Sequence, residues 1–443
     1  MQCDLLIENA IIVPVEPMAV YRPGYLAVAG DSIAAIGEGS AAKDLEPRKR
    51  INGDGLLVMP GLVNAHTHVA MTLMRGYADD LRLEPWLQKK IWPLEFNLTA
   101  GDCYWGSLLG IVEMLKSGAT TFNDMYHFSE ATARAARDAG IRACPSEVLL
   151  SFLPDARERM ERAFAEARQW NGTADGRIRP MFALHATYSV SKELMREVVE
   201  EAKRQGLRIH IHLSETAWEV EQSRGHTGKT PVEVAAEGGA FEPGALAAHC
   251  VHVDDNDIAI LHEAGVGVSH NPTSNLKLAS GFAPVVAMLR RGVTLGLGTD
   301  GAASNNNLDM WEELRLAALL HKAVTNDPTA LPAAQALRMA TLGGAEALGL
   351  AGEIGSLTVG KKADLILLDL RRPHLTPLFE PISHLVYCAR ADDVRTVIVN
   401  GRVLVEDGRC VTVNEEQAMA KAAEHAHALI ERAQAGAERW ATS

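Results

Sequence analysis

The sequence has little of what marks secreted, membrane-spanning or disulfide-rich proteins. Six cysteines lie far apart and form no Cys-x-x-Cys pair: Cys3, Cys103, Cys144, Cys250, Cys388 and Cys410. This spacing argues against a disulfide framework or a zinc knuckle and favours reduced thiols in a cytoplasm. No apolar run approaches the roughly 20 residues that span a bilayer, and no low-complexity tract is present.

Basic residues are also too few to suggest a polyanionic partner. Lys and Arg number 43 against 56 Asp and Glu, a formal charge of -13. This balance argues against nucleic acid or an anionic membrane as the main partner. The opening stretch MQCDLLIENA lacks the basic region of a secretory signal, so we expect a cytoplasmic protein. The expected partner is a small-molecule substrate, and a homo-oligomer stays open.

The middle of the 443-residue chain, residues 58–355, alternates apolar stretches with amphipathic ones. Eight candidate strands follow in order: Leu57–Ala65, Ala119–Asp124, Ile141–Glu147, Arg179–His185, Leu207–His212, Ala245–His249, Val266–His270 and Val293–Thr299. Regular alternation of strand and helix predicts a parallel sheet. Eight such units predict an α/β protein with a (β/α)8 TIM-like barrel, whose chemistry lies at the carboxyl ends of the strands.

The two ends of the chain have a different pattern. Residues 1–57 and 356–412 are rich in short β-type stretches, and Asn400-Gly401 marks a hairpin turn. The predicted strands are Asp4–Val13, Tyr25–Gly37, Asp364–Leu370 and Val394–Val405. We expect both ends to join in one small composite β-sandwich domain. Residues 413–443 predict a C-terminal helix.

The stretch VMPGLVNAHTH, residues 58–68, is the most informative motif. His66 and His68 stand two apart, so on a strand their side chains point the same way. The apolar run Leu56–Val63 that precedes them predicts a buried strand. A histidine pair at the end of such a strand suggests half of a metal site, although hydrogen-bonded polar residues at a strand end would look the same.

Further possible metal ligands lie at the ends of other predicted strands. They are His210 and His212 on the fifth, His249 and His252 after the sixth, His270 on the seventh and Asp300 after the eighth. A mononuclear catalytic metal takes about three or four ligands and keeps one position for water. The first-strand pair, one fifth-strand histidine and Asp300 supply such a set for one divalent ion. Its charge would make a bound water acidic.

Other side chains suit a hydrolytic site. Glu215 is placed to move protons between water and a substrate, and His249 to stabilise hydroxide from the far side. Alone, Glu215 could be a helix N-terminal charge and Asp300 a helix cap. Asp124, Met125 and His127 could line the pocket, with Asp124 equally suited to a loop hydrogen bond. The joint pattern over several strand ends favours the metal site.

The chain resembles the amidohydrolase superfamily in motifs along its whole length: PGLVNAHTH, WLQKKIWPLE, FNDMY, ALHATYSVS, IHLSET, AAHCVH, VSHNPTSNLKLASG and GTDGAASNNNLDM. It is most similar to the 5′-methylthioadenosine/S-adenosylhomocysteine deaminases. The resemblance implies a metal-dependent hydrolytic deaminase of adenine nucleosides, possible substrates being these two and adenosine. The products would be the inosine analogue and ammonia.

The resemblance also assigns roles. It implies one divalent ion, most often zinc, held by His66, His68, His212 and Asp300, and so selects His212 over His210. It makes Glu215 the proton shuttle to the purine, His249 the group beside the attacking hydroxide, and Asp300 the acceptor of the water proton. Two more residues are implied to bind substrate: Glu95, through the ribose hydroxyls, and His185.

One position departs from the family. Some nucleoside deaminases of this group have an arginine after the third strand, near the substrate's sulfur-bearing tail. Here Glu147 stands about there, and Arg157 and Arg159, in a predicted loop that follows, are candidates to substitute for that arginine. We interpret Glu147 as an acid that disfavours the carboxylate of a homocysteine tail.

Three alternatives remain. A guanine- or cytosine-type deaminase or a triazine hydrolase would share the metal residues. A binuclear cyclic-amide hydrolase needs a bridging lysine, and the fourth strand offers His185 instead. A non-catalytic binding protein would be expected to lack a ligand or the shuttle.

Overall fold

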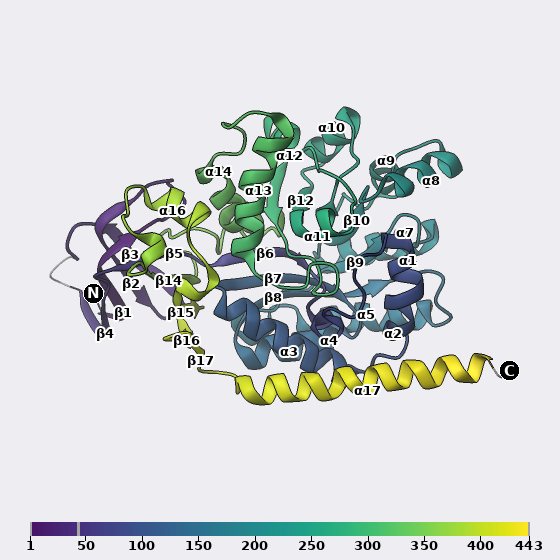
Figure 1. Ribbon diagram of the computed structural model, residues 1–443, viewed down its shortest axis with the longest axis horizontal. Coiled ribbons are helices and arrows are strands. Elements are labelled where there is room, and N and C mark those ends of the chain that lie inside the picture. The colour runs from purple at the N-terminus through teal and green to yellow at the C-terminus, as the bar shows by residue number, and fades with distance from the viewer. Residues whose placement is uncertain (1, 42–44, 442–443) are drawn as a thin grey trace.

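The computed structural model describes residues 2–41 and 45–441, with backbone only for 436–441. A barrel and a twisted sheet lie side by side, and a long C-terminal helix runs along the barrel (Figure 1). The last two residues of the predicted C-terminal helix, 442–443, fall outside the described residues. The domain limits at 57, 355 and 412 stay a prediction.

Eight parallel strands close into the predicted barrel. They follow chain order around it: β6 (Leu62–Thr67), β7 (Ala119–Tyr126), β8 (Arg142–Leu149), β9 (Phe182–Ala186), β10 (Ile209–Leu213), β11 (Ala245–His249), β12 (Gly267–His270) and β13 (Thr294–Leu297). Nearly every residue of these strands is buried. Both faces are covered because side chains fill the interior and helices cover the outside, as in other parallel barrels.

The helices that follow the strands form the outer ring. In chain order they are α3 (Ala100–Lys116), α4 (Ser129–Ala139), α5 (Ala156–Trp170), α6 (Thr173–Gly176), α7 (Lys192–Gln205), α8 (Ala217–Thr227), α9 (Pro231–Glu237), α10 (Asp255–Glu263), α11 (Pro272–Lys277), α12 (Val285–Arg291), α13 (Met310–Thr325), α14 (Ala333–Arg338), the π-helical turn η3 (Met339–Gly343) and α15 (Gly344–Ala347). Several begin at side-chain caps: Thr99 opens α3 in a capping box with Asp102, and Ser191 caps α7.

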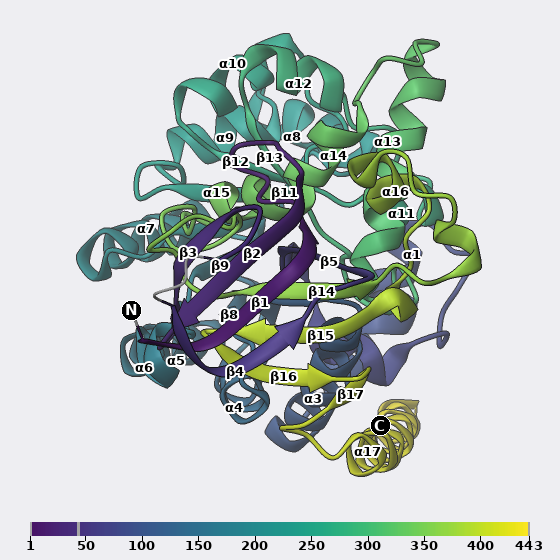
Figure 2. The same ribbon diagram turned by 90° about the vertical axis from the view of Figure 1, so that its left-hand side faces the viewer.

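The two chain ends form one nine-stranded sheet, which confirms the predicted composite β-domain. Its strands are β1 (Gln2–Ile12), β2 (Tyr21–Ala29), β3 (Ser32–Glu38), β4 (Glu46–Asn52), β5 (Leu56–Pro60), β14 (Leu365–Asp369), β15 (Val394–Val399), β16 (Arg402–Glu406) and β17 (Arg409–Cys410). The ends meet where β5 pairs with β1 on one side and β14 on the other (Figure 2). Asn400 and Gly401 both have positive φ, as the predicted hairpin turn requires.

The first predicted barrel strand, Leu57–Ala65, is two strands. The chain leaves the composite sheet with β5 and enters the barrel with β6, and the break falls at Pro60-Gly61. A Cβ on Gly61 would lie 2.1 Å from the Thr120 side chain, so only glycine allows this close passage.

Short helices complete the chain. Between β6 and α3 lie the 3-10 helix η1 (Val69–Met74), α1 (Leu83–Trp86), the π-helical turn η2 (Leu87–Ile91) and α2 (Trp92–Glu95). Late in the chain come η4 (Pro373–Leu375), α16 (Pro381–Tyr387), η5 (Ala391–Asp393) and the long α17 (Glu415–Ala441). Over residues 2–41 and 45–441, no helix has the length and apolar character to cross a bilayer.

Candidate metal centre and substrate cavity

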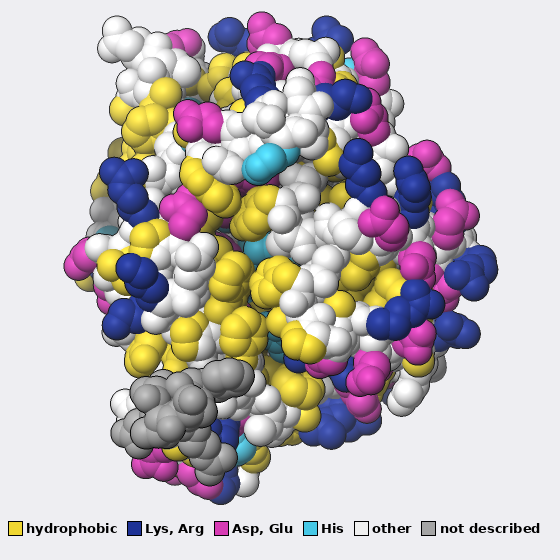
Figure 3. Space-filling view, turned by 90° about the vertical axis from the view of Figure 1, so that its right-hand side faces the viewer, with side chains coloured by type: hydrophobic (Ala, Val, Ile, Leu, Met, Phe, Trp, Pro, Cys, Tyr) yellow, Lys and Arg dark blue, Asp and Glu magenta, His cyan; other side chains and the backbone are white. Residues whose placement is uncertain are grey.

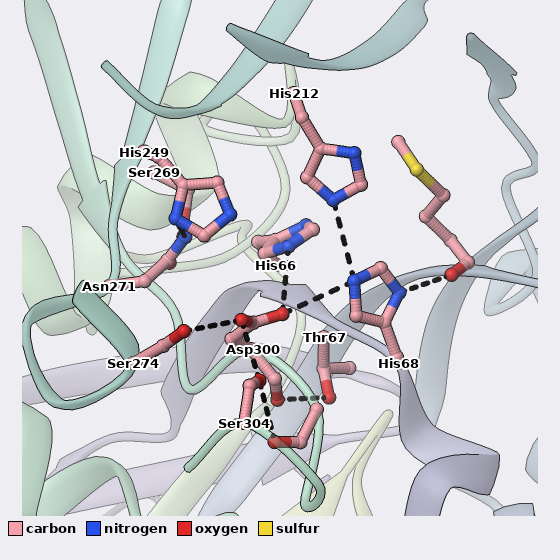
Figure 4. Close-up of polar contacts among 12 residues, drawn as sticks. His66, Thr67, His68, His212, His249, Ser269, Asn271, Ser274, Asp300 and Ser304 are labelled. Carbon is pink, nitrogen blue, oxygen red and sulfur yellow. Dashed lines mark hydrogen bonds and ion pairs between the residues drawn. The ribbon is translucent and has the colours of Figure 1, made fainter. Parts of the chain in front are cut away.

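Four of the predicted ligands converge at the carboxyl end of the barrel (Figure 4). The Asp300 Oδ1 atom, after β13, lies 3.3 Å from His66 Nε2 and 3.2 Å from His68 Nε2, both at the end of β6. His212, on β10, places its Nε2 atom 3.4 Å from that of His68. Three imidazole nitrogens and a carboxylate oxygen thus face one point, which is the donor set of a mononuclear site.

The buried polar atoms of the cluster also indicate that it binds a cation. Among the residues that the structure describes, His66 Nε2 and Asp300 Oδ1 are buried and have no aligned hydrogen-bond partner. Buried polar atoms without partners are costly, and they signal a missing group. A divalent ion at this point satisfies both atoms, so the cluster supports a metal ion.

Asp300 is held firmly in place. Its Oδ2 atom accepts hydrogen bonds from Ser274 Oγ at 2.6 Å and Ser304 Oγ at 2.7 Å, and its backbone carbonyl accepts one from Thr67 Oγ1 at 2.9 Å. Its φ of 61° is uncommon for a residue other than glycine. These contacts turn the Oδ1 atom toward the histidines.

Backbone carbonyls orient two of the rings. His68 Nδ1 donates to the Met125 carbonyl at 2.5 Å, and His212 Nδ1 donates to the His185 carbonyl at 2.7 Å. A ring that donates from Nδ1 keeps its Nε2 lone pair for a metal. His210, by contrast, lies behind the cluster, where its Nε2 atom pairs with His66 Nδ1 at 2.8 Å.

The charges of the site complement one another. Burial lowers the pKa of His66 to about 3. Burial acts the same way on His68, but the Asp300 carboxylate outweighs it and raises the pKa of His68 to about 9. Burial disfavours the Asp300 carboxylate, yet the two histidines hold its pKa well below the ordinary value. The Asp300 carboxylate thus favours positive charge at the point that the histidine nitrogens face.

A cavity opens above the cluster and, with the open space at its mouth included, encloses about 630 Å³. On the face shown in Figure 3, apolar side chains surround a recess in which histidine is visible. Within the described part of the chain, no lysine or arginine lines the cavity. Its lining residues include His68, Met71, Leu83, Trp86, Leu87, Trp92, Glu95, Met125, Tyr126, His127, Val148, Leu150, His185, Tyr188, His212, Glu215, His249, Leu278, Asp300 and Ser304.

Glu215 and His249 lie together beside the cluster. Glu215 Oε2 is 3.7 Å from His249 Nε2, and Glu215 Oε1 is buried without a hydrogen-bond partner in the described chain. Burial raises the pKa of the Glu215 carboxyl, which helps it to carry a proton. The Glu219 carboxylate accepts from the Glu215 backbone amide at 2.8 Å, and His249 Nδ1 pairs with Asn275 Oδ1 at 2.9 Å.

Glu95 and His185 line another part of the same cavity. The Glu95 Oε2 atom lies 3.7 Å from His127 Nε2. Burial opposes the Glu95 charge, but His127 and Tyr126 outweigh it, and the pKa of this carboxyl falls below its ordinary value. Arg159 donates to His127 Nδ1 at 3.2 Å, so the His127 proton is on the nitrogen that faces Glu95.

The interpretation of Glu147 is wrong. Glu147 is buried but does not line the cavity. Its carboxylate accepts from the Ser129 amide at 2.9 Å and lies 3.4 Å from Arg162, outside the barrel wall. Its neighbour on β8, Val148, faces the cavity instead. Arg157, the other basic residue considered, is exposed and pairs with Glu161 and Glu197.

Sequence reasoning missed the residues that hold Asp300 and His249 in place. Ser274, Ser304 and Asn275 lie within motifs that were recognised, but only tertiary distances reveal their hydrogen bonds. Met125 and His127 line the cavity as anticipated. Asp124 does not, and it accepts from the Val69 amide at 2.7 Å as a loop hydrogen-bonder.

A (β/α)8 barrel with histidines and an aspartate gathered at its strand ends has the architecture of a metal-dependent hydrolase. The model of the Amidohydrolase family matches residues 57–404. The chain therefore belongs to the amidohydrolase family.

Relatives and solved structures extend this assignment. The chain is 51% identical to a 5-methylthioadenosine/S-adenosylhomocysteine deaminase of Pelotomaculum thermopropionicum, with 97% of this chain and 99% of the relative covered. It is 48% identical to a 5'-deoxyadenosine deaminase of Methanosarcina acetivorans, with 98% and 100% covered. The crystal structure of an adenosine deaminase from Xanthomonas campestris with bound zinc superposes with a TM-score of 0.93 at 38% identity, covering 97% of this chain and 99% of that one.

Proposed function

We propose that this protein is a zinc-dependent hydrolytic deaminase of adenine nucleosides that prefers an uncharged 5′ substituent, as in 5′-methylthioadenosine and 5′-deoxyadenosine. The observation that carries the proposal is one cavity that contains both a hydrolytic cluster and the buried carboxylate of Glu95. The names of the relatives and the zinc in the Xanthomonas structure support it.

His66, His68, His212 and Asp300 are the proposed zinc ligands. Three nitrogens and one oxygen suit zinc and leave a position open for water. When bound, the ion lowers the pKa of a water molecule and makes it a nucleophile near neutral pH. Asp300 is placed to accept a proton from that water, because its Oδ1 atom faces the cluster.

Glu215 acts on the purine. It donates a proton to the ring nitrogen next to the carbon that bears the amine, and this makes the carbon electrophilic. Water adds to that carbon. One of its two protons passes through Asp300 to the amine, which leaves as ammonia, and the other restores the Glu215 carboxyl. His249, whose Nε2 atom is 3.7 Å from Glu215, stabilises the oxygen that has added. The raised pKa of Glu215 suits a group that must both give and take a proton.

Glu95 selects a nucleoside over a free base. Its pKa is lowered, so it is a carboxylate and can accept hydrogen bonds from the two ribose hydroxyls. His127, whose Nε2 atom is 3.7 Å from this carboxylate, helps to keep it charged, and His185 lines the cavity as a second substrate contact.

The cavity wall favours an uncharged tail at the 5′ position. Leu83, Leu87, Val148 and Leu150 contribute apolar side chains to the wall. The Arg159 side chain is engaged by His127 and by Asp155, whose Oδ2 atom is 2.8 Å from Arg159 Nε. A homocysteine carboxylate entering this cavity would lose water without gaining a free cation. The proposed preference for an uncharged 5′ substituent therefore rests on the cavity lining and not on Glu147.

Ammonia release from adenine nucleosides that differ in their 5′ substituent tests the proposal. We expect kcat/KM to be highest for 5′-methylthioadenosine and 5′-deoxyadenosine and lower for S-adenosylhomocysteine. A preference for the homocysteine tail would overturn the part that concerns the 5′ substituent. Release from guanine, cytosine or a triazine, with none from the nucleosides, would overturn the deaminase proposal and leave only a metal-dependent hydrolase.

A further inference from the structure

The segment that covers the cavity has little stability of its own. We define this cap segment as residues 83–98, which contain α1, η2 and α2. It supplies five residues of the cavity lining: Leu83, Trp86, Leu87, Trp92 and Glu95. Its helices are four or five residues long, and within the described ranges none starts with a side-chain capping bond. Such short helices depend on tertiary contacts.

The C-terminal helix α17 supplies apolar contacts of this kind. In Figure 1 it runs along the outside of the barrel past α3 and α2. Leu429 is 1% exposed and belongs to the same apolar cluster as Trp86, Ile91, Leu94 and Leu98 of the cap segment. The cap segment therefore lies between the cavity on one side and α17 on the other.

A polar contact joins α17 to the end of the cap segment. Arg432 donates through Nε to the Asn97 carbonyl at 3.2 Å and through Nη2 to the Asp102 carboxylate. Asp102 is fully buried and also accepts from the Thr99 amide at 2.8 Å and from His425 Nδ1 at 2.7 Å. One guanidinium thus ties the last turn of the cap segment to the start of α3.

We propose that α17 is a strap that positions the ribose-binding carboxylate, with Arg432 as its principal positioning residue. Asn97 lies two residues beyond Glu95, and the Leu98 amide donates to the Glu95 carbonyl at 3.1 Å. A change at Arg432 therefore reaches Glu95 through the backbone. The hydrogen bonds of Arg432 go to Asn97 and Asp102, and not to His66, His68, His212 or Asp300. The proposal rests on the proposed function for its kinetic readout only.

If α17 positions Glu95 in this way, a change at Arg432 should weaken substrate binding and leave the chemical step unchanged. Removing the Arg432 guanidinium leaves the buried Asp102 charge with fewer partners and frees the Asn97 carbonyl. The carboxylate of Glu95 then loses its fixed position, and small misplacements of binding groups are costly. We expect KM for 5′-methylthioadenosine to rise about tenfold, equivalent to about 1.4 kcal/mol, with kcat and bound metal unchanged.

The experiment compares three variants of the full-length, metal-loaded protein. Arg432→Met removes the charge, Arg432→Lys keeps the charge without the two-pronged contact, and Glu431→Gln alters the exposed neighbour on the same helix as a control. The measurements are kcat, KM, metal content and hydrogen exchange of the amides in residues 83–98. We expect the largest change in Arg432→Met, partial rescue in Arg432→Lys and wild-type values in Glu431→Gln.

Hydrogen exchange separates this proposal from the proposed function. Faster exchange of the cap segment in Arg432→Met supports the strap even if no adenine nucleoside reacts. Unchanged exchange there, or a fall in kcat and metal content without a rise in KM, overturns it. If Arg432→Met does not fold, the same measurements on Arg432→Lys, which keeps the charge and loses the two-pronged contact, decide between these outcomes.

Discussion

The role of Glu95 leads to a prediction with a calculable size. The Glu95 side chain is 7% exposed, and its lowered pKa keeps it charged. If it accepts from both ribose hydroxyls, removing the 2′-hydroxyl leaves a buried carboxylate short of one partner. Such a loss costs about 1–3 kcal/mol, so kcat/KM should fall about 5- to 150-fold for the 2′-deoxy analogue.

A double-mutant cycle isolates the contact. Ammonia release is measured for 5′-methylthioadenosine and its 2′-deoxy analogue, with wild type, Glu95→Ala and the exposed control Lys89→Gln. Glu95→Ala should discriminate between the two nucleosides by less than about threefold, because the partner of the 2′-hydroxyl is gone. Lys89→Gln should discriminate as wild type does. Equal discrimination in wild type and Glu95→Ala would refute the ribose role of Glu95.

Three further predictions concern the metal and the shuttle. His66→Ala and Asp300→Ala should each lose bound metal and activity together, as elemental analysis and ammonia release would show. Glu215→Gln keeps the shape of the side chain but cannot carry the proton, so kcat should fall about 10²- to 10⁴-fold with metal retained. Ser274→Ala or Ser304→Ala removes one hydrogen bond that orients Asp300, and metal affinity measured by competition with a chelator should fall about 10- to 100-fold.

Each of these three predictions has a result that would contradict it. Full metal occupancy in both His66→Ala and Asp300→Ala would exclude these residues as ligands. A Glu215→Gln enzyme within about threefold of wild type would make Glu215 a structural residue. Unchanged metal affinity in both serine variants would mean that Asp300 is oriented by its backbone alone.

The barrel could be predicted because its signals are local. Each strand is an apolar run after a turn, and the polar residues that follow mark its carboxyl end. His66, His68, Asp300 and the fifth-strand pair His210 and His212 therefore stood out by position, and only the family resemblance selected His212 over His210. The break at Pro60-Gly61 was missed because the apolar run continues across it, although the dipeptide itself is a turn signal.

The inward face of β8 could not be predicted in the same way. All eight residues of this strand are buried, so no alternation of polar and apolar residues shows which side faces the cavity. The resemblance to related deaminases put Glu147 near the substrate, and the pattern of β8 could not correct this, whereas the structure places Val148 in the cavity wall. Contacts between distant segments, such as Ser304 with Asp300 or Arg432 with Asn97, leave no periodic signal at all.

Metal-dependent turnover of an adenine nucleoside tests the central claim most directly. The measurement is the rate of ammonia release from 5′-methylthioadenosine, with bound metal quantified, before and after chelation and after zinc is restored. We predict turnover that disappears with the metal, returns at about one zinc ion per chain and yields one inosine analogue for each ammonia. Undiminished turnover by fully metal-free protein, or none by the zinc-loaded protein with any adenine nucleoside, would contradict the account.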